Sequence, residues 1–327
     1  MTHKPQAKMP LLPSNYSPPI FFRNGHLSTI HAGLLRRVDA PHQERERLEL
    51  SDGDFLDLDW SRAKMPGRKL VLLLHGLEGD AQRPYITGSA KLFTQNGHDC
   101  CALNLRGCSG SPNRLYASYH SGSTRDLREV LDHILETTDY DQIYLKGFSL
   151  GGNLLLKYLG EEGELPKQLK GAVAVSVPCD LKSSCQRLHS PENFLYHQRF
   201  KRHLLAKLRQ KQALFPDRIS AEELLKIKTL RDFDEIYTSR AHHFEDALDY
   251  YQKCSSLGFL PGISLPCLLI NARNDSFLGP ECFPMEAAQN NPKLFLETPA
   301  HGGHVGFWGK NNITYTEKRA LEFFGSL

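Results

Sequence analysis

The sequence predicts an α/β fold built on a mostly parallel, doubly wound sheet with a helical insertion. Three observations lead to this prediction. Near-continuous apolar runs of strand length recur along the chain, helical patterns lie between successive runs, and one long interval carries helical patterns only. Unbroken apolar runs are typical of parallel strands buried on both faces, and strands that alternate with helices are typical of βαβ units.

The predicted elements follow one another in order. We expect residues 1–20, which are polar and rich in proline, to form a loosely held N-terminal arm before one domain at 21–327. Residues 48–60 alternate around Asp52-Gly53, a dipeptide typical of a hairpin turn. The expected buried strands are Lys69–Leu74, Cys100–Leu105, Gln142–Leu145, Ala172–Val177, Cys267–Ile270 and Leu294–Leu296. The helices expected between them are Tyr85–Asn96, Thr124–Glu136, Asn153–Leu159 and Pro280–Gln289.

One interval breaks this alternation. Between Val177 and Cys267 no buried-strand run occurs, and apolar residues such as Leu204 and Leu208 recur at helical spacing. We therefore expect a helical cap over about 180–262, placed on the carboxyl edge of the sheet. The basic segment 199–211 has two interpretations. It is either the solvated face of an amphipathic helix, which we favour, or a contact site for an anionic lipid surface or substrate.

The composition and charge of the chain argue against several classes of protein. The chain has 327 residues and a formal net charge of +3, which is too small to indicate nucleic-acid binding. No apolar run approaches the length of a transmembrane helix, and the N-terminus lacks the features of a signal peptide. We expect a cytoplasmic protein, with peripheral membrane contact as an open alternative. The 8 cysteines include no C-x-x-C pair, so neither a metal site nor a disulfide framework is expected.

The most informative motif is Gly147-Phe148-Ser149-Leu150-Gly151. It lies between a strand-like run and a helix-like run, the context of a nucleophile elbow. Such a turn exposes the serine hydroxyl, and the residues two before and two after the serine come too close for side chains. Both are glycine here. The helix that begins at Leu150 directs its N-terminal N–H groups toward an oxygen that becomes negative during acyl transfer. We therefore predict Ser149 as a nucleophile; the alternative is a chance glycine–serine turn.

A serine nucleophile needs a histidine base and a carboxylate that orients it, in the chain order serine, acid, histidine. Only His301 and His304 follow the last strong strand, and the flanking glycines favour His304. Asp275 lies just past the Cys267–Ile270 strand and is our predicted acid. Its rival is Asp180, which we expect instead to cap the first helix of the insertion.

The second oxyanion donor is expected in the loop after the first buried strand. This loop reads His75-Gly76-Leu77-Glu78-Gly79. The backbone N–H of Leu77 would join that of Leu150 in binding the oxyanion. His75 comes too early in the chain to be the base, and we expect it to brace the loop. Arg106 and Arg114 follow another strand end, where they either pair with an anionic head group or brace the loop.

Taken together, these motifs resemble those of the YheT-like α/β-hydrolases, bacterial relatives of a group of eukaryotic α/β-hydrolase-domain lipases. The resemblance extends through most of the chain and rests on Asn24-Gly25-His26-Leu27, Glu49–Phe55, His75–Gly79, Arg106–Gly110, Pro112–Arg114, Tyr119–Gly122, the elbow with Gly152-Asn153, Asp249–Tyr251 and His301–Phe307. It implies the α/β-hydrolase fold and a cytosolic, cofactor-free serine hydrolase of carboxylic esters. It carries the catalytic triad onto Ser149, Asp275 and His304. Relatives often have Asp-Asp where this chain has Asn274-Asp275.

These observations predict a serine esterase that acts through an acyl-enzyme on a small-molecule acyl ester, with lipid esters among the candidates. Two alternatives stay open. One is an acyltransferase that uses the same triad with an alcohol acceptor. The other is a non-catalytic hydrolase scaffold that binds a lipid or a protein partner.

Overall fold

The computed structural model describes residues 10–65, 67–161 and 163–327. Within these residues the strands form one nine-stranded sheet in the order β1-β9-β8-β7-β6-β4-β5-β3-β2. The strands are β1 (Leu11–Leu12), β2 (Glu44–Glu49), β3 (Phe55–Ser61), β4 (Lys69–Leu74), β5 (Asp99–Asn104), β6 (Gln142–Phe148), β7 (Leu169–Val175), β8 (Cys267–Ile270) and β9 (Leu294–Glu297). Every predicted buried strand is therefore present.

The sheet is parallel except at one edge. β4 to β9 pair in parallel, whereas β3 pairs antiparallel with both β5 and β2. The hairpin predicted around Asp52-Gly53 joins β2 to β3. β6 lies between β4 and β7, and Leu74 of β4 pairs with Gly147 of β6. The loops that follow these two strands therefore meet at the carboxyl edge of the sheet.

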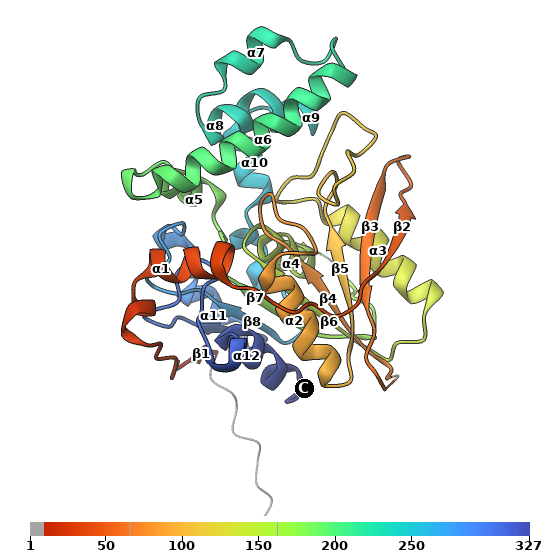
Figure 1. Cartoon of the computed structure of the whole chain (residues 1–327), viewed down its shortest axis with the longest axis vertical. Coiled ribbons are helices and arrows are strands. Elements are labelled where there is room, and N and C mark those ends of the chain that lie inside the picture. Colours follow the sequence, from red (N-terminus) through yellow and green to blue (C-terminus); the bar gives the residue numbers. More distant parts are fainter. Residues whose placement is uncertain (1–9, 66, 162) are drawn as a thin grey trace, which may run out of the picture.

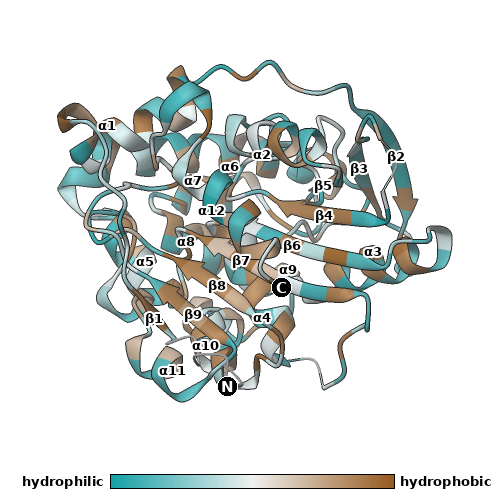
Figure 2. Ribbon diagram, turned by 90° about the horizontal axis from the view of Figure 1, so that it is seen from below, coloured by the Kyte–Doolittle hydropathy of each residue, from teal (hydrophilic) through white to brown (hydrophobic). Residues whose placement is uncertain are grey.

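Helices cover both faces of the sheet because its central strands are apolar on both sides. In β4, Leu70, Leu72 and Leu74 pack on one face with α3 (Thr124–Thr137) and α4 (Leu150–Glu161). Val71 and Leu73 pack on the other face with α2 (Pro84–Gln95) and α12 (Tyr315–Phe324). Figure 2 shows β4 and β7 to β9 as mainly hydrophobic ribbons between these helices. The predicted doubly wound α/β fold is confirmed.

Among the predicted elements whose bounds differ from the structure, two differ for a clear local reason. The expected helix Pro280–Gln289 consists of a short 3₁₀ turn, η6 (Pro280–Cys282), and a separate helix, α11 (Met285–Asn290). Pro284 stands between them and cannot donate the backbone hydrogen bond that a continuous helix needs. β7 ends at Val175 rather than Val177 because Ser176 has a φ of 53°, which leaves the strand conformation.

The N-terminal segment is attached to the domain more firmly than expected. Leu11–Leu12 forms β1, which pairs in parallel with β9 at the sheet edge. Tyr16 then packs against the ring of Tyr315, with ring centroids 4.7 Å apart. A loosely held arm therefore does not describe residues 10–20, and residues 1–9 of the predicted arm lie outside the described residues. The next elements are η1 (Ile20–Arg23), α1 (Gly25–Ile30) and η2 (His31–Leu35).

The interval between β7 and β8 is helical. Its main elements are α5 (Leu181–Leu188), α6 (Phe194–Leu214), α7 (Ala221–Lys226), α8 (Leu230–Phe233), η4 (Asp234–Thr238), α9 (Ser239–Ala241) and α10 (Ala247–Cys254). Figure 1 shows α6 to α9 as a layer above the sheet domain. Leu204, Leu208 and Leu230 belong to an apolar cluster within this layer. No helix among the described residues is long and apolar enough to cross a membrane.

Candidate active site

Ser149 occupies a sharp turn between β6 and α4. Its φ is 53°, a left-handed conformation that is strained for a residue with a side chain, and its N–H donates to the carbonyl of Val175 at 2.9 Å. A Cβ at position 147 would lie 2.5 Å from the carbonyl oxygen of Gly151. Glycine is therefore required where α4 approaches β6. The elbow geometry expected from the motif is present in the structure.

His304 reaches Ser149 from a glycine-rich loop after β9. Its Nε2 lies 2.9 Å from Ser149 Oγ, and its Nδ1 lies 2.8 Å from Asp275 Oδ2. Gly302 and Gly303 have φ values of 149° and 59°, so the loop uses conformations that favour glycine. The structure therefore brings the three residues predicted from distant parts of the sequence into one hydrogen-bonded chain.

The Asp275 carboxylate is enclosed and oriented by its surroundings. Its side chain has 0% relative exposure, and its Oδ1 accepts a hydrogen bond from the backbone N–H of Phe277 at 3.0 Å. The Phe277 ring packs against the His304 imidazole, with centroids 4.3 Å apart. The imidazole thus has a carboxylate at Nδ1, an aromatic ring on one face and the serine hydroxyl at Nε2.

The rival acid and the rival base have other partners. Asp180 is the N-cap of α5, where its Oδ1 accepts from the N–H of Ser183 at 2.7 Å. His301 Nδ1 lies 3.1 Å from the carbonyl oxygen of Arg23. The helix cap expected for Asp180 and the preference for His304 over His301 both agree with these contacts.

The predicted oxyanion donors lie beside Ser149. Leu77 and Leu150 line the same cavity as Ser149 and His304. Leu150 is the first residue of α4, where backbone N–H groups have no acceptor inside the helix. The N–H groups on either side of Leu77, those of Gly76 and Glu78, donate to tyrosine hydroxyls, and Leu77 N–H has no acceptor among the described residues. Two backbone donors therefore stay available next to the serine.

Other polar residues of the predicted site have structural roles. His75 is buried, its Nε2 accepts from the N–H of Leu105 at 3.1 Å, and burial lowers its pKa to about 4. Arg106 is paired with three aspartates, and Arg114 is paired with Glu49. Burial raises the pKa of the Cys108 thiol to about 11, which removes its nucleophilic thiolate at neutral pH. Arg106 and Arg114 therefore brace loops through these ion pairs.

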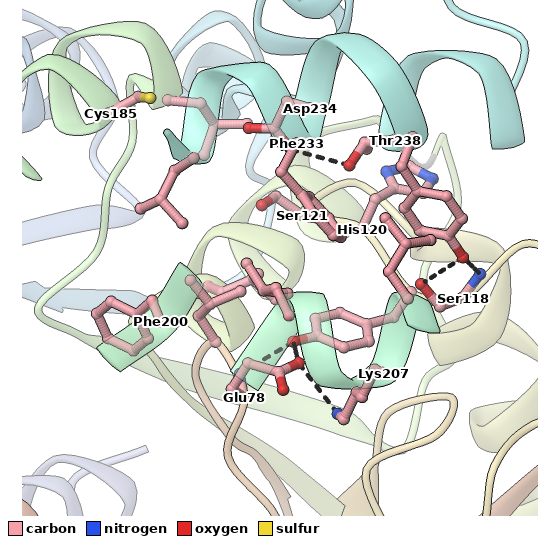
Figure 3. Close-up of a pocket in the computed structure, with 18 of the residues that line it drawn as sticks. Glu78, Ser118, His120, Ser121, Cys185, Phe200, Lys207, Phe233, Asp234 and Thr238 are labelled. Atoms are coloured by element: carbon pink, nitrogen blue, oxygen red, sulfur yellow. Dashed lines mark hydrogen bonds and ion pairs between the residues drawn. The ribbon is translucent and has the colours of Figure 1, made fainter. Parts of the chain in front are cut away.

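A cavity of about 160 Å³ lies between the sheet and the helical layer, and Ser149 and His304 line it. Its walls are mainly apolar and include Leu77, Leu181, Leu188, Phe200, Leu204, Leu208, Leu230, Phe233, Phe277 and Leu278. Figure 3 shows Phe200 and Phe233 among the side chains that line this space. Among the described residues no cluster of three or more His, Cys, Asp or Glu side chains could hold a metal ion.

The basic segment 199–211 lies on α6 and divides between two environments. Lys207 Nζ bonds to Glu78 Oε1 at 3.0 Å, and Lys211 Nζ bonds to the carbonyl of Asn113 at 2.8 Å. Arg202 and Arg209 are exposed. Part of the segment therefore ties α6 to the sheet domain, a function that neither interpretation of the sequence included.

Thr29 is a site residue that the sequence did not reveal. Its Oγ1 accepts a hydrogen bond from the backbone N–H of His304 at 2.8 Å, and Asn274 Oδ1 accepts from the adjacent Gly303 N–H at 3.0 Å. Thr29 belongs to α1, far from the elbow in sequence. The neighbouring motif Asn24-Gly25-His26-Leu27, one of those on which the family resemblance rests, was the one sequence signal that this region contributes to the site.

Comparison with known proteins places the chain in a family. A model described as the alpha/beta hydrolase fold matches residues 69–311. Over 293 residues the chain is 35% identical to the YheT protein of Escherichia coli (strain K12). The matched region covers 88% of this chain and 85% of that protein. This chain belongs to the α/β-hydrolase family. The resemblance to the YheT-like α/β-hydrolases that the motifs indicated is thereby confirmed.

Two further similarities extend this assignment. Phospholipase ABHD3 of Homo sapiens is 27% identical over 97% of this chain and 80% of its own length. The solved structure of the Pyrococcus furiosus esterase Pf2001 superposes with a TM-score of 0.59 at 17% identity and covers 87% of this chain and 90% of that chain. At this identity the structural likeness shows the α/β-hydrolase fold alone.

Proposed function

We propose that this α/β-hydrolase is a serine esterase with Ser149, His304 and Asp275 as its catalytic triad. The observation that carries the proposal is the hydrogen-bonded chain from Ser149 Oγ through His304 to Asp275 at the wall of an apolar cavity. A serine hydroxyl is a weak nucleophile at neutral pH unless an oriented histidine accepts its proton. The sequence relatives with esterase and phospholipase names support the same reaction class.

The reaction follows from the roles of these groups. Ser149 Oγ attacks the ester carbonyl while His304 Nε2 accepts its proton, and the Asp275 carboxylate stabilises the resulting imidazolium. The Leu77 and Leu150 N–H groups bind the oxyanion, and each such donor contributes about 3–4 kcal/mol in comparable sites. His304 then protonates the leaving alcohol. Water, activated by the same imidazole, releases the acyl group from Ser149.

Serine-directed labelling tests this proposal. The wild-type protein is expected to react with a fluorophosphonate and to hydrolyse an aryl ester. Ser149→Ala is expected to lose labelling and to lower kcat by at least about 10³-fold, because it removes the nucleophile and leaves only binding and oxyanion contacts. Ser111→Ala, at a position outside the triad, serves as the matched control. Continued labelling and turnover by folded Ser149→Ala would refute the assignment.

Acyl transfer to an alcohol is a second candidate, favoured by the apolar lining of the cavity. An apolar site admits an alcohol with a hydrocarbon chain more readily than water. The same acyl-enzyme would then form, and an alcohol would take the place of water in its release. Product analysis with an added short-chain alcohol distinguishes the two reactions, since transfer yields a new ester and hydrolysis yields only the acid.

A further inference from the structure

The cavity contains a carboxylate that the proposed ester chemistry does not use. Asp234, the first residue of the π-helical segment η4, lines the cavity together with Ser149 and His304. Its Oδ1 accepts from the Thr238 hydroxyl at 2.9 Å, and its Oδ2 accepts from the Tyr251 hydroxyl at 2.7 Å. Both donors are neutral. π-Helical turns are rare and occur frequently at functional sites.

Asp234 has no cationic partner among the described residues, although cations line the same cavity. Lys207 is paired with Glu78, Arg106 is paired with aspartates of the sheet domain, and Lys211 bonds to backbone carbonyls. Figure 3 shows Asp234 and Thr238 on one side of the pocket and the Glu78–Lys207 pair on the opposite side. Asp234 therefore lines the cavity without a counterion among the described residues.

A carboxylate in this position is unfavourable for the empty protein. Enclosing a charge without a counterion is unfavourable, and such groups are concentrated at functional sites. Burial raises the pKa of Asp234 to about 6, and the hydrogen bonds from Tyr251 and Thr238 oppose that rise. The group is thus mainly ionised at neutral pH and offers a negative charge to whatever occupies the cavity.

Aromatic rings surround this part of the cavity. Phe233 and Tyr237 come from the same segment of the insertion, with centroids 5.3 Å apart. Tyr250 and Tyr251 of α10 are likewise 5.3 Å apart. All four line the cavity. An ammonium group that loses its hydration shell is stabilised by aromatic faces and by a nearby carboxylate, and this combination recognises quaternary ammonium ligands.

We propose that Asp234, with the rings of Phe233, Tyr237, Tyr250 and Tyr251, forms a subsite for an ammonium group on the ester substrate. The inference rests on the proposed esterase function and specifies a substrate class for it. The ammonium group lies on a part of the substrate away from the scissile bond. Its positive charge supplies the counterion that Asp234 lacks among the described residues.

Pairs of esters that differ only in this charge test the subsite. On the alcohol side, choline butyrate is compared with 3,3-dimethylbutyl butyrate, in which carbon replaces the ammonium nitrogen. On the acyl side, ethyl 4-(trimethylammonio)butyrate is compared with ethyl 5,5-dimethylhexanoate. In one of these pairs the wild-type protein is expected to show a kcat/KM about tenfold or more higher for the cation, and the pair shows which side of the ester carries the group.

Asp234→Asn removes the charge and keeps the shape of the side chain. Its amide oxygen can accept one of the two hydrogen bonds, and its NH2 group can donate to the other hydroxyl. In this variant, the kcat/KM for the cationic ester divided by that for its neutral partner is expected to fall toward one. Glu222→Gln removes an exposed carboxylate of the insertion and is the control that leaves the ratio unchanged. A merely structural role would lower both members of a pair equally.

The outcomes separate this proposal from the parent one. Wild-type ratios near one in both pairs would overturn the subsite even if Asp234→Asn failed to fold. An unchanged ratio in a folded Asp234→Asn protein would overturn it as well. Absence of hydrolysis of every ester, the aryl ester included, would refute the esterase function instead.

Discussion

At the scale of single residues, Asp180 and Asp275 are close equivalents in sequence. Each follows a parallel strand at the carboxyl edge of the sheet, and an acid at either place could orient a histidine. The structure separates them by their partners: Asp275 Oδ2 lies 2.8 Å from His304, whereas Asp180 caps α5. The same side-chain chemistry therefore contacts the histidine in one loop, where we propose a catalytic role, and caps a helix in the other.

Asparagine substitution should strongly lower kcat at Asp275 and leave it nearly unchanged at Asp180. Asp275→Asn is expected to lower kcat by about 10³–10⁴-fold with little loss of stability, because the amide does not stabilise the imidazolium and favours the wrong tautomer. Asp180→Asn keeps a good N-cap residue, so both kcat and stability should stay near wild type, and Asp180→Ala should lose about 1 kcal/mol of stability. Steady-state kinetics and urea unfolding measure the two effects. A large fall in kcat for Asp180→Asn alone would reverse the assignment of the acid.

At the scale of elements, the site is assembled by contacts between segments remote in sequence. α1 contacts the His304 loop through Thr29, and α6 contacts the loop His75–Gly79 through the Lys207–Glu78 ion pair. Glu78 itself has a φ of 53°, and its N–H and carboxylate both bond to the Tyr119 hydroxyl. The loop that carries the Leu77 N–H is therefore positioned partly by the helical layer above it.

Thr29→Val should impair catalysis without unfolding the protein. It removes the acceptor for the His304 N–H while keeping the shape of the side chain. A small displacement of the imidazole is expected to lower kcat about tenfold or more, since misplacement of about 1 Å costs about 10²-fold. Thr29→Ser keeps the hydroxyl and should restore most of the activity. Equal activity of the valine and serine variants would show that this hydrogen bond does not position His304.

The Lys207–Glu78 pair should be coupled in a double-mutant cycle. Lys207→Met leaves the Glu78 carboxylate, whose side chain is 4% exposed, without its cation, so this variant is expected to be less stable than the wild type. Lys207→Met combined with Glu78→Gln removes both charges and should recover part of the lost stability. Thermal unfolding of the four proteins measures the coupling. Additive changes would show that the pair does not link α6 to the loop His75–Gly79.

At the scale of the whole molecule, the core of the sheet domain encloses a lysine. Lys146 of β6 is fully buried, and its Nζ donates to Ser89 Oγ at 3.0 Å and to the Thr316 carbonyl at 3.2 Å. Burial lowers its pKa from 10.5 to about 7. Between these two values the unfolded chain binds more protons at this site than the folded chain does. The contribution of Lys146 to stability therefore increases as the pH rises through this window.

Lys146→Met should remove this pH dependence. The free energy of unfolding of the wild type minus that of the variant is expected to rise between pH 7 and pH 9, by at most about 1.4 kcal/mol per pH unit. Urea unfolding at several pH values measures the difference, and other titrating groups cancel because both proteins share them. A difference that stays constant over this range would show that Lys146 does not lose its proton in the fold.

Local sequence was sufficient for much of the architecture. The apolar runs predicted the parallel strands, and Asp52-Gly53 predicted the hairpin. The spacing of Gly147, Ser149 and Gly151 predicted the elbow, because strand burial, turn geometry and helix initiation depend mainly on neighbouring residues. Pro284 was also a local signal, because a proline interrupts the hydrogen bonds of a helix. The helix predicted over Pro280–Gln289 did not take this break into account.

Tertiary structure alone decided which candidates meet. It brought Asp275 and His304 to Ser149, attached Leu11–Leu12 to the sheet edge and placed Thr29 behind the histidine loop. It also placed Asp234 in the same cavity as Ser149 without a counterion among the described residues. These relations join residues far apart in the chain. They depend on the packing of whole elements, which no local pattern of residue types specifies.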